Sequence, residues 1–252
     1  YDDIKTAADH VHWVGERGPH AGNFRSAAKG GGHAHAGAMV YLGGSWPEEY
    51  RNEIFMNNIN GARFNRDHPQ RSGSGYAVQH RPDFMAMNDS WSQWLNFKYD
   101  ASGSVFAIDW YDKNQCHSPN PDVHDKTMGR IFKISHENDK WVQADLSKAS
   151  DMELVNYQLH ANDWYVRQAR TLLQERGPNQ KVHKALKDIL AKNPDATRKL
   201  RALWALHVTK GMTEKELVDL LANENEYVRS WSIQFLVENK TASPETLKRF
   251  AE

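Results

Sequence analysis

The feature that most constrains the fold is a change of composition near residue 148 of this 252-residue chain. Residues 1–148 hold 14 of the 16 glycines and 10 of the 13 histidines, whereas residues 149–252 are rich in Leu, Ala, Lys and Glu. Short apolar runs between glycines are typical of strands and turns, and the second composition is typical of helices. We therefore expect two domains, a β domain over 1–148 followed by an α domain over 149–252.

Short apolar runs bounded by turn residues predict the strands of the first half. The expected strands are Ala38–Leu42, Ile54–Asn57, Ala62–Asn65, Phe84–Met87, Leu95–Tyr99, Ser104–Asp109 and Arg130–Ser135. The clearest hairpin joins 95–99 to 104–109 through a turn that contains Asp100 and Gly103. A hairpin of this kind is common in the blades of β-propellers.

An internal repeat organises the second half. Tyr-Val-Arg at 165–167 recurs at 227–229, and Lys-Leu-Arg at 199–201 opens another helix between them. Shorter helices are expected before these three, at 151–160, 180–192 and 213–222, and Ser243-Pro244-Glu245 resembles the start of a further helix. Helix pairs that repeat about every 28–34 residues are typical of a HEAT-type α-solenoid.

Charge and cysteine content exclude several classes of protein. The 32 basic residues balance the 32 acidic ones, so no overall charge attracts nucleic acid or an anionic membrane. No apolar run reaches the roughly 18 residues of a transmembrane segment. One cysteine, Cys116, rules out an internal disulfide framework, and without a C-x-x-C-H motif we expect no haem within this chain. The chain begins at Tyr1 without a leader, so we expect a mature product or an excised fragment.

Two H-x-H pairs are the first candidate site residues. His10 and His12 form one pair, and His33 and His35 form the other within the glycine-rich stretch Gly30–Gly44. Imidazoles two residues apart on an extended backbone point the same way, where they can bind a transition metal or supply a general base. The alternative is that they pack against tryptophans and bond to loop carbonyls.

A second candidate set combines amides with a guanidinium after an apolar strand. Asn57, Asn58 and Arg63 can hold sugar hydroxyls or quinone carbonyls, because an amide both donates and accepts. Asx-turn chemistry at the end of a strand is an equally good explanation of the asparagines.

A third candidate set lies at the end of the strand 104–109. Asp109 and Asp112 flank Trp110 and Tyr111; carboxylates of this kind suit calcium, and an aromatic ring beside them suits stacking on a sugar. The alternative is that the aspartates cap a turn and the aromatic residues belong to the core.

Several linked motifs together resemble one known family. They are G-G-G-H-A-H-A-G-A-M-V-Y-L-G-G-S-W-P-E-E-Y-R, I-F-M-N-N-I-N-G-A-R-F-N-R-D, R-S-G-S-G-Y, H-R-P-D-F, N-D-S-W and D-W-Y-D-K-N-Q-C-H. Over nearly its whole length the chain is similar to the membrane-bound dehydrogenases of planctomycetes and verrucomicrobia. The resemblance implies the C-terminal part of a β-propeller like that of glucose/sorbosone dehydrogenases, followed by HEAT repeats.

The same resemblance implies a function. It suggests a fragment of an extracytoplasmic, quinoprotein-like sugar or aldehyde dehydrogenase that passes electrons to a cytochrome c partner or domain. Pyrroloquinoline quinone (PQQ) and calcium are the cofactors of the sugar-dehydrogenase relatives. The roles that we expect are general base for His33 or His35, cofactor contacts for Asn57, Asn58, Arg63 and Trp110, calcium ligation for Asp109 and Asp112, and weaker metal binding for His10 and His12.

Two departures from the family pattern bear on activity. Asn60 stands where the family usually has His in a pattern like N-N-I-H-G, and the family often has Cys in the segment that reads His-Ala-His-Ala here. If the missing His is catalytic, this chain is inactive. The alternative function is therefore a non-catalytic carbohydrate-binding or protein-interaction scaffold, and a metal-dependent hydrolase that uses the H-x-H pairs is a third possibility.

Overall fold

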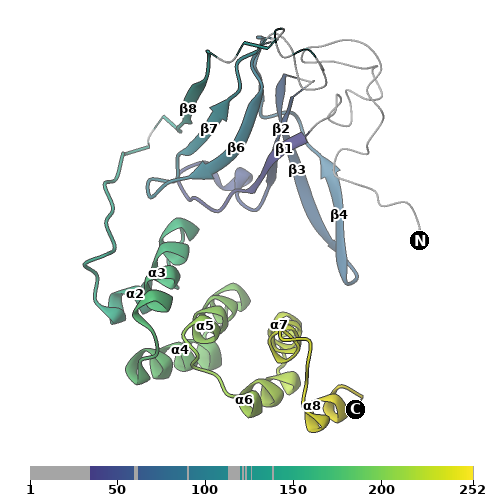
Figure 1. Cartoon of the computed structure of the whole chain (residues 1–252), viewed down its shortest axis with the longest axis vertical. Helices are drawn as coiled ribbons and strands as arrows, with labels where there is room; N and C mark the ends of the chain where they lie inside the picture. Colours follow the sequence, from purple (N-terminus) through teal and green to yellow (C-terminus); the bar gives the residue numbers. More distant parts are fainter. Residues whose placement is uncertain are drawn as a thin grey trace. The chain divides into compact units, whose positions relative to one another are not determined.

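The computed structural model describes residues 35–59, 62–89, 91–112, 120, 122, 124–125, 127–137 and 139–251. The predicted site residues His10, His12 and His33 lie outside the described residues, as do Asn60 and Cys116. The chain divides into two compact units, residues 1–142 and 143–252, which are described separately. Antiparallel sheets make up the first unit and helices make up the second (Figure 1).

Five strands form the first sheet of the β unit. They are β1 (His35–Val40), β2 (Ile54–Asn58), β3 (Arg63–Ser72) and β4 (Gly75–His80) in that order, with a short β5 (Met85–Ala86) that also pairs with β3. A 3₁₀ turn, η1 (Glu48–Tyr50), lies between β1 and β2. Strand β4 was not predicted from the sequence, and β3 ends at residue 72, seven residues beyond the predicted end at 65.

The second sheet has three strands, β6 (Trp94–Tyr99), β7 (Val105–Asp109) and β8 (Arg130–Ile134). The predicted hairpin between 95–99 and 104–109 is confirmed, since Tyr99 lies opposite Val105. Gly103 closes its turn at φ +89°, a value that glycine adopts without the steric cost of a side chain.

An aromatic layer joins the two sheets. Phe64 of β3 stacks on Phe97 of β6 with 4.3 Å between ring centroids, and Tyr41 after β1 lies edge-on to Tyr99 at 5.8 Å. Gly37 makes the close approach possible, because a Cβ at this position would lie 2.5 Å from the backbone nitrogen of Asn96. The glycine-rich stretch singled out in the sequence therefore serves packing at this position.

The hydroxyl of Tyr41 fixes the loop after β1. It accepts hydrogen bonds from the backbone nitrogens of Gly44, Ser45 and Trp46 and donates one of 2.8 Å to the carbonyl oxygen of Gly103. Tyr41 is fully buried, so one side chain connects the first sheet to the hairpin of the second.

The helical unit contains seven α-helices among its described residues. They are α2 (Asp151–Tyr157), α3 (Asp163–Arg176), α4 (Gln180–Lys192), α5 (Ala196–Val208), α6 (Glu214–Asp219), α7 (Glu226–Leu236) and α8 (Pro244–Ala251), with a 3₁₀ turn η3 (Leu220–Ala222) after α6. None of the helices in the described ranges has the length and apolar character needed to cross a bilayer.

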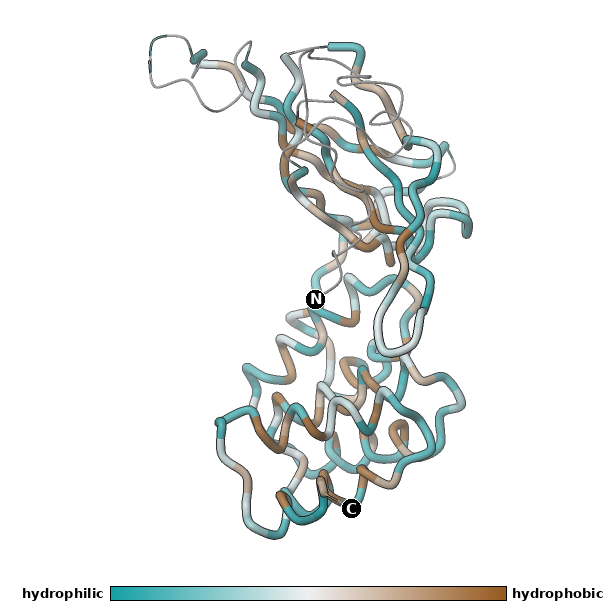
Figure 2. The backbone as a smooth tube through the Cα atoms, turned by 90° about the vertical axis from the view of Figure 1, so that its right-hand side faces the viewer, coloured by the Kyte–Doolittle hydropathy of each residue, from teal (hydrophilic) through white to brown (hydrophobic). Residues whose placement is uncertain are grey.

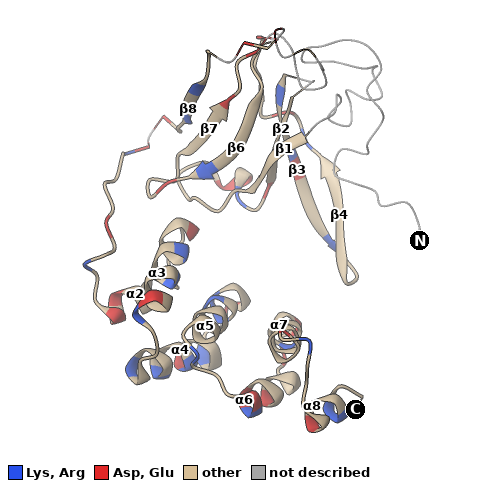
Figure 3. Ribbon diagram, viewed as in Figure 1, with Lys and Arg blue, Asp and Glu red and all other residues tan. Residues whose placement is uncertain are grey.

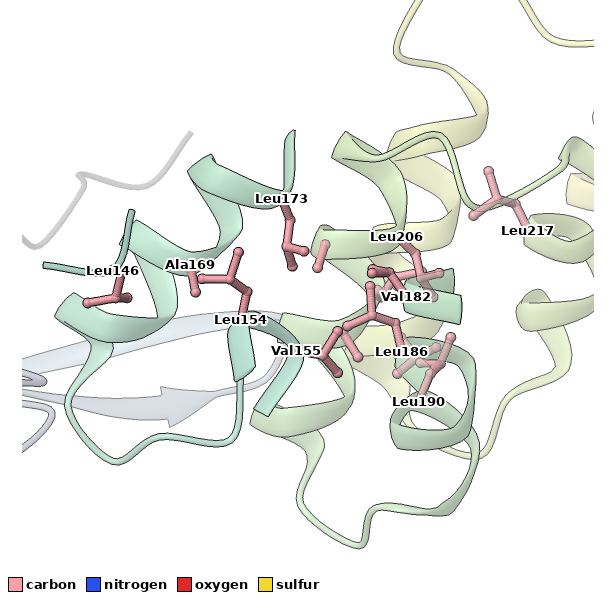
Figure 4. Packing of buried hydrophobic residues seen from close by; sticks show 14 of the residues in the cluster. Leu146, Leu154, Val155, Ala169, Leu173, Val182, Leu186, Leu190, Leu206 and Leu217 are labelled. Carbon is pink, nitrogen blue, oxygen red and sulfur yellow. The ribbon is translucent and has the colours of Figure 1, made fainter. Parts of the chain in front are cut away.

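Consecutive helices pair, and the second members of the pairs lie side by side. α2 packs on α3, α4 on α5 and α6 on α7, while α5 contacts both α3 and α7. Leu154, Leu186 and Leu206, all fully buried, point into the layer between the helices (Figure 4). Hydrophobic segments alternate with hydrophilic ones along these helices, as Figure 2 shows, and this alternation is why apolar spacing predicted them.

The fold class that the sequence predicts is therefore correct in its coarse form, antiparallel β sheets followed by α-helices. Within the described residues the two sheets are open and do not close into a ring, so these strands do not establish a propeller. The helix pairs likewise do not by themselves establish the HEAT class.

Candidate functional site

Polar side chains alternate along β3 and define the candidate site. Arg63, Asn65 and Asp67 occupy every second position and so share one face of the strand, while Phe64 lies on the other face within the aromatic layer. Arg63 is 1% exposed, and Asn65 and Asp67 are fully buried. A buried polar face is costly unless its groups bond to one another or to a ligand, so this face requires an explanation.

Neighbouring strands add to this polar face. Asn58 of β2 lies opposite Arg63, and His35 of β1 lies opposite Asn58, so these three residues form one row across the sheet. His80 of β4 lies opposite Asp67 in a second row. We call the face that carries His35, Asn58, Arg63, Asn65, Asp67 and His80 the polar face of the first sheet.

Asp83, in the loop after β4, links the two rows of the polar face. Its carboxylate accepts from Arg63 Nη1 at 2.7 Å and from Asn65 Nδ2 at 3.0 Å. His80 Nε2 lies 3.4 Å from the same carboxylate. The guanidinium, the amide and the imidazole are therefore held in fixed positions around one carboxylate.

A histidine–aspartate pair occupies the outer row. His80 Nδ1 lies 2.9 Å from Asp67 Oδ1, and the imidazole lies between Asp67 and Asp83. Burial lowers the pKa of His80, but the hydrogen bonds and charges of Asp67 and Asp83 outweigh it and raise the pKa to about 9. The imidazole is therefore an imidazolium at neutral pH.

Asp67 carries the most informative atom of the polar face. Its Oδ2 is buried and has no hydrogen-bond partner among the described residues. Burial raises the pKa of Asp67 more than the hydrogen bond and charge of His80 lower it, and the charges of Asp83 and Glu53 add to the rise. A buried carboxylate oxygen without a donor is a position where a ligand hydroxyl can bond.

Among the predicted site residues, the structure brings together His35, Asn58 and Arg63 and separates Asn57 from them. Asn57 lies opposite Phe64, on the aromatic side of the sheet, where its Nδ2 donates to the carbonyl oxygen of Trp94. It is 1% exposed, and it connects the two sheets.

The third predicted set lies on the other sheet. The Asp109 carboxylate accepts from the backbone nitrogen of Gln93 at 2.7 Å and forms an ion pair with Arg130, whose guanidinium covers the ring of Tyr111 at 3.8 Å. Trp110 is 52% exposed. These contacts give Asp109 a basic partner inside the sheet.

Asp112 is fully buried and accepts a 3.0 Å hydrogen bond from the backbone nitrogen of Asp125, with His124 Nδ1 3.4 Å away. In the part of the chain that the structure describes, no group of three or more His, Cys, Asp or Glu residues is arranged to hold a metal ion. Calcium ligation by Asp109 and Asp112 therefore stays a prediction.

Sequence reasoning missed the residues at the centre of the polar face. Asp67, His80 and Asp83 were named only within the family motifs I-F-M-N-N-I-N-G-A-R-F-N-R-D and H-R-P-D-F and were given no role. The signal was present in Arg63-Phe-Asn-Arg-Asp67, because polar residues at every second position on a strand that also carries Phe64 indicate one polar and one apolar face. It was hidden because β4, which supplies His80, was not expected.

Comparison with known families assigns the first unit. Residues 5–138, more than half of the chain, match the family DUF7133, described as a domain of unknown function. The chain belongs to this family. No curated protein and no solved structure matches the chain.

Proposed function

We propose that the polar face of the first sheet is part of the substrate site of a quinoprotein-like sugar or aldehyde dehydrogenase. The observation that carries the proposal is Asp67 Oδ2, a buried carboxylate oxygen without a hydrogen-bond partner among the described residues, next to an imidazolium held by two carboxylates. A sugar hydroxyl, or the hydrated form of an aldehyde, is a donor of the kind that this oxygen lacks.

The chemistry needs a proton acceptor and a hydride acceptor. Asp67 Oδ2 takes the hydroxyl proton, and its raised pKa makes it a stronger base than an exposed aspartate. His80, protonated and held between Asp67 and Asp83, stabilises through its positive charge the negative charge that develops on the hydroxyl oxygen. PQQ, when bound, would supply the hydride acceptor for the substrate carbon.

The residues of the polar face suit a quinone better than they suit calcium. Arg63, Asn58 and Asn65 provide a guanidinium and amides, the groups that bond carbonyl and carboxylate oxygens, and Asp67 Oδ2 has no hydrogen-bond partner among the described residues. For calcium the described residues offer no set of three acidic or imidazole ligands, so we derive no step through a metal.

The resemblance to membrane-bound dehydrogenases supports the remainder of this proposal. From it we infer that the two sheets are part of a propeller and that the helix pairs are HEAT repeats. It also suggests an extracytoplasmic location and a cytochrome c as the electron acceptor. The open edges of the sheets and the pairing of α2 to α7 agree with that architecture.

A matched pair of histidines tests the proposal. His80 pairs with Asp67 on the polar face, whereas His68 pairs with Glu53 on the opposite face. With PQQ, calcium and a dye acceptor supplied over a panel of sugars and aldehydes, His80→Gln is expected to lower turnover by about 100-fold. His68→Gln is expected to stay within about twofold of the unchanged protein.

The same experiment separates the second candidate function, carbohydrate binding without chemistry. The bonds of Asp83 to Arg63 and Asn65 favour that candidate, because a rigid set of polar groups is what a binding surface needs. No turnover and no PQQ binding by calorimetry would reject the dehydrogenase. Sugar binding that persists and is lost in His80→Gln would then establish the scaffold.

A further inference from the structure

Strand β4 forms an open edge of the first sheet. The strand order ends at β4, which pairs only with β3 among the described residues and is the outermost strand of this sheet in Figure 1. Most residues of β4 are exposed, and Tyr76 is 58% exposed. An open edge presents unpaired backbone groups to other strands, so folded proteins normally cover or protect it.

The register of β3 and β4 shows which backbone groups face outward. Just beyond β4, the backbone nitrogen of Arg81 donates to the carbonyl oxygen of Arg66 at 2.9 Å, which makes these two residues a hydrogen-bonded pair of the antiparallel ladder. Such pairs alternate with non-hydrogen-bonded pairs, so every second residue of β4 directs its N–H and C=O away from β3. These residues are Tyr76, Val78 and His80.

A proline in β3 supports this register. Pro69 lies opposite Val78, and a residue without an N–H fits a non-hydrogen-bonded pair. No hydrogen bond joins the outward backbone groups of Tyr76, Val78 and His80 to another residue that the structure describes. Three N–H and three C=O groups therefore remain available along one edge.

This edge has none of the usual protection against pairing. The sequence Gly-Tyr-Ala-Val-Gln-His of β4 contains no proline and no Lys, Arg, Asp or Glu, as the uncoloured strand in Figure 3 shows. At the other described edges, β6 carries Lys98, β8 carries Arg130 and Lys133, and the register of β1 is irregular between Ala36 and Met39. Charges and irregular registers of this kind oppose the addition of a strand.

The outward residues of β4 are complementary to themselves. In an antiparallel pair of two β4 strands related by a two-fold axis at Val78, Tyr76 lies opposite His80 of the second copy and Val78 lies opposite Val78. The three pairs can form about six backbone hydrogen bonds, two for each pair. No like charges lie opposite one another, and the two valines form a β-branched cross-strand pair.

We propose that β4 is a self-association site, which pairs antiparallel with β4 of a second copy of this chain. A second copy is favoured over an unrelated segment, because β4 offers no Lys, Arg, Asp or Glu to select another sequence. The pairing would place Tyr76 of the second copy beside His80, so each copy contributes a residue to the polar face of the other. This inference goes beyond the dehydrogenase proposal and does not depend on it.

Charge changes at the two-fold axis test the pairing. Sedimentation equilibrium over a series of concentrations gives the dimer dissociation constant of the whole chain. Val78→Lys and Val78→Asp each place like charges opposite one another, and each is expected to weaken the dimer about tenfold. The control Gln79→Lys adds the same charge to the same strand but faces Ala77 of the second copy, so its constant is expected to stay within about threefold.

Mixing the two variants shows whether position 78 meets its own copy. An equal mixture of Val78→Lys and Val78→Asp is expected to dimerise at least as tightly as the unchanged chain, which also shows that both variants fold. A chain that stays monomeric at about 1 mM, a dimer that Val78→Lys does not weaken, or a mixture that does not recover dimerisation would each overturn the proposal.

Amide hydrogen exchange gives a second readout, residue by residue. The amides of Ala77 and Gln79 bond to β3 and are expected to be protected at every concentration of the unchanged chain. The amides of Tyr76, Val78 and His80 are expected to gain protection only as the concentration rises and the dimer forms. Dimerisation without this gain would place the interface elsewhere and contradict the pairing of β4.

Discussion

Two arginines, one in each unit, are buried to nearly the same degree and have different surroundings. Arg201 is 2% exposed, pairs with Asp163 and donates to the carbonyl oxygen of His160 at 2.9 Å, within the helical unit. Arg63 is 1% exposed and pairs with Asp83, but it belongs to a whole face of buried polar groups.

The difference separates two uses of buried charge. The ion pair of Arg201 with Asp163 positions α5 against α3 and the turn before it, which is a structural role. A face of buried polar groups that includes Asp67 Oδ2, which has no hydrogen-bond partner among the described residues, exceeds what positioning requires. We therefore assign the helical core to stability and the polar face to function.

The largest expected effect concerns the structural arginine. Arg201→Met should destabilise the helical unit by about 3 kcal/mol, because the buried Asp163 keeps only its pair with the exposed Arg167 and the carbonyl oxygen of His160 loses its donor. Hydrogen exchange of α3 and α5 in increasing urea measures the loss. Arg198→Met is the control, since its ion pair to Asp195 is 3.9 Å long and the Asp195 side chain is half exposed. A cost below about 1 kcal/mol would remove the distinction drawn above.

Arg63→Met should cost less, about 1–2 kcal/mol. Asp83 keeps its hydrogen bond from Asn65 and its contact with His80, and its side chain is 23% exposed, so water can replace part of the lost guanidinium. Urea unfolding followed by hydrogen exchange of β3 gives the value. A loss as large as that of Arg201→Met would mean that Arg63 is equally structural.

The stability of the β unit should depend on pH through His80. Its pKa in the folded state is about 9, above the ordinary value of 6.5. Its contribution to the stability of the β unit is therefore complete below pH 6.5 and is lost as the pH rises through about 9, a loss of about 3 kcal/mol. Urea unfolding at a series of pH values measures it, and His80→Gln should flatten the curve between those limits. An unchanged slope in that variant would rule out His80 as the cause.

The smallest effect is expected at a helix terminus. Asn162 caps α3 by accepting a 2.9 Å hydrogen bond from the backbone nitrogen of Trp164, so Asn162→Ala should cost about 1 kcal/mol. Asn156→Ala, on the exposed side of α2, should cost nothing or stabilise slightly, because alanine is the better helix former. Thermal unfolding of both variants measures the two stability changes. Equal changes in Asn162→Ala and Asn156→Ala would mean that the Asn162 cap contributes nothing to stability.

The helices were more predictable from the sequence than the strands. Apolar spacing with stop signals gave 180–192 residue for residue, since an amphipathic helix carries its own periodicity and caps. Strand β4 was not predicted because Arg71-Ser-Gly-Ser-Gly-Tyr76 is typical of a loop. The residues of β4 are largely exposed, so β4 is a strand because it pairs with β3 and not because it is buried.

The candidate site was predictable only in part. Asn58, Arg63 and His35 were found because they follow or begin apolar runs, and the register of β1, β2 and β3 brings them together. Asp67 and His80 are thirteen residues apart and meet only through the β3–β4 pairing. Residue spacing within one segment cannot predict a contact between two strands. The Asp67–His80 pair could therefore not be predicted without β4.

The most direct test of the assignment is one variant measured in two ways. Asp67→Asn keeps an oxygen that can accept from His80 and removes both the attraction of the carboxylate for His80 and the cost of burying its charge. These two effects offset, so the free energy of unfolding at neutral pH should change by less than about 1 kcal/mol. Dye-linked oxidation of the best sugar or aldehyde should fall by about 100-fold or more. A large loss of stability with unchanged oxidation would contradict the account, because Asp67 would then be a structural residue like Arg201.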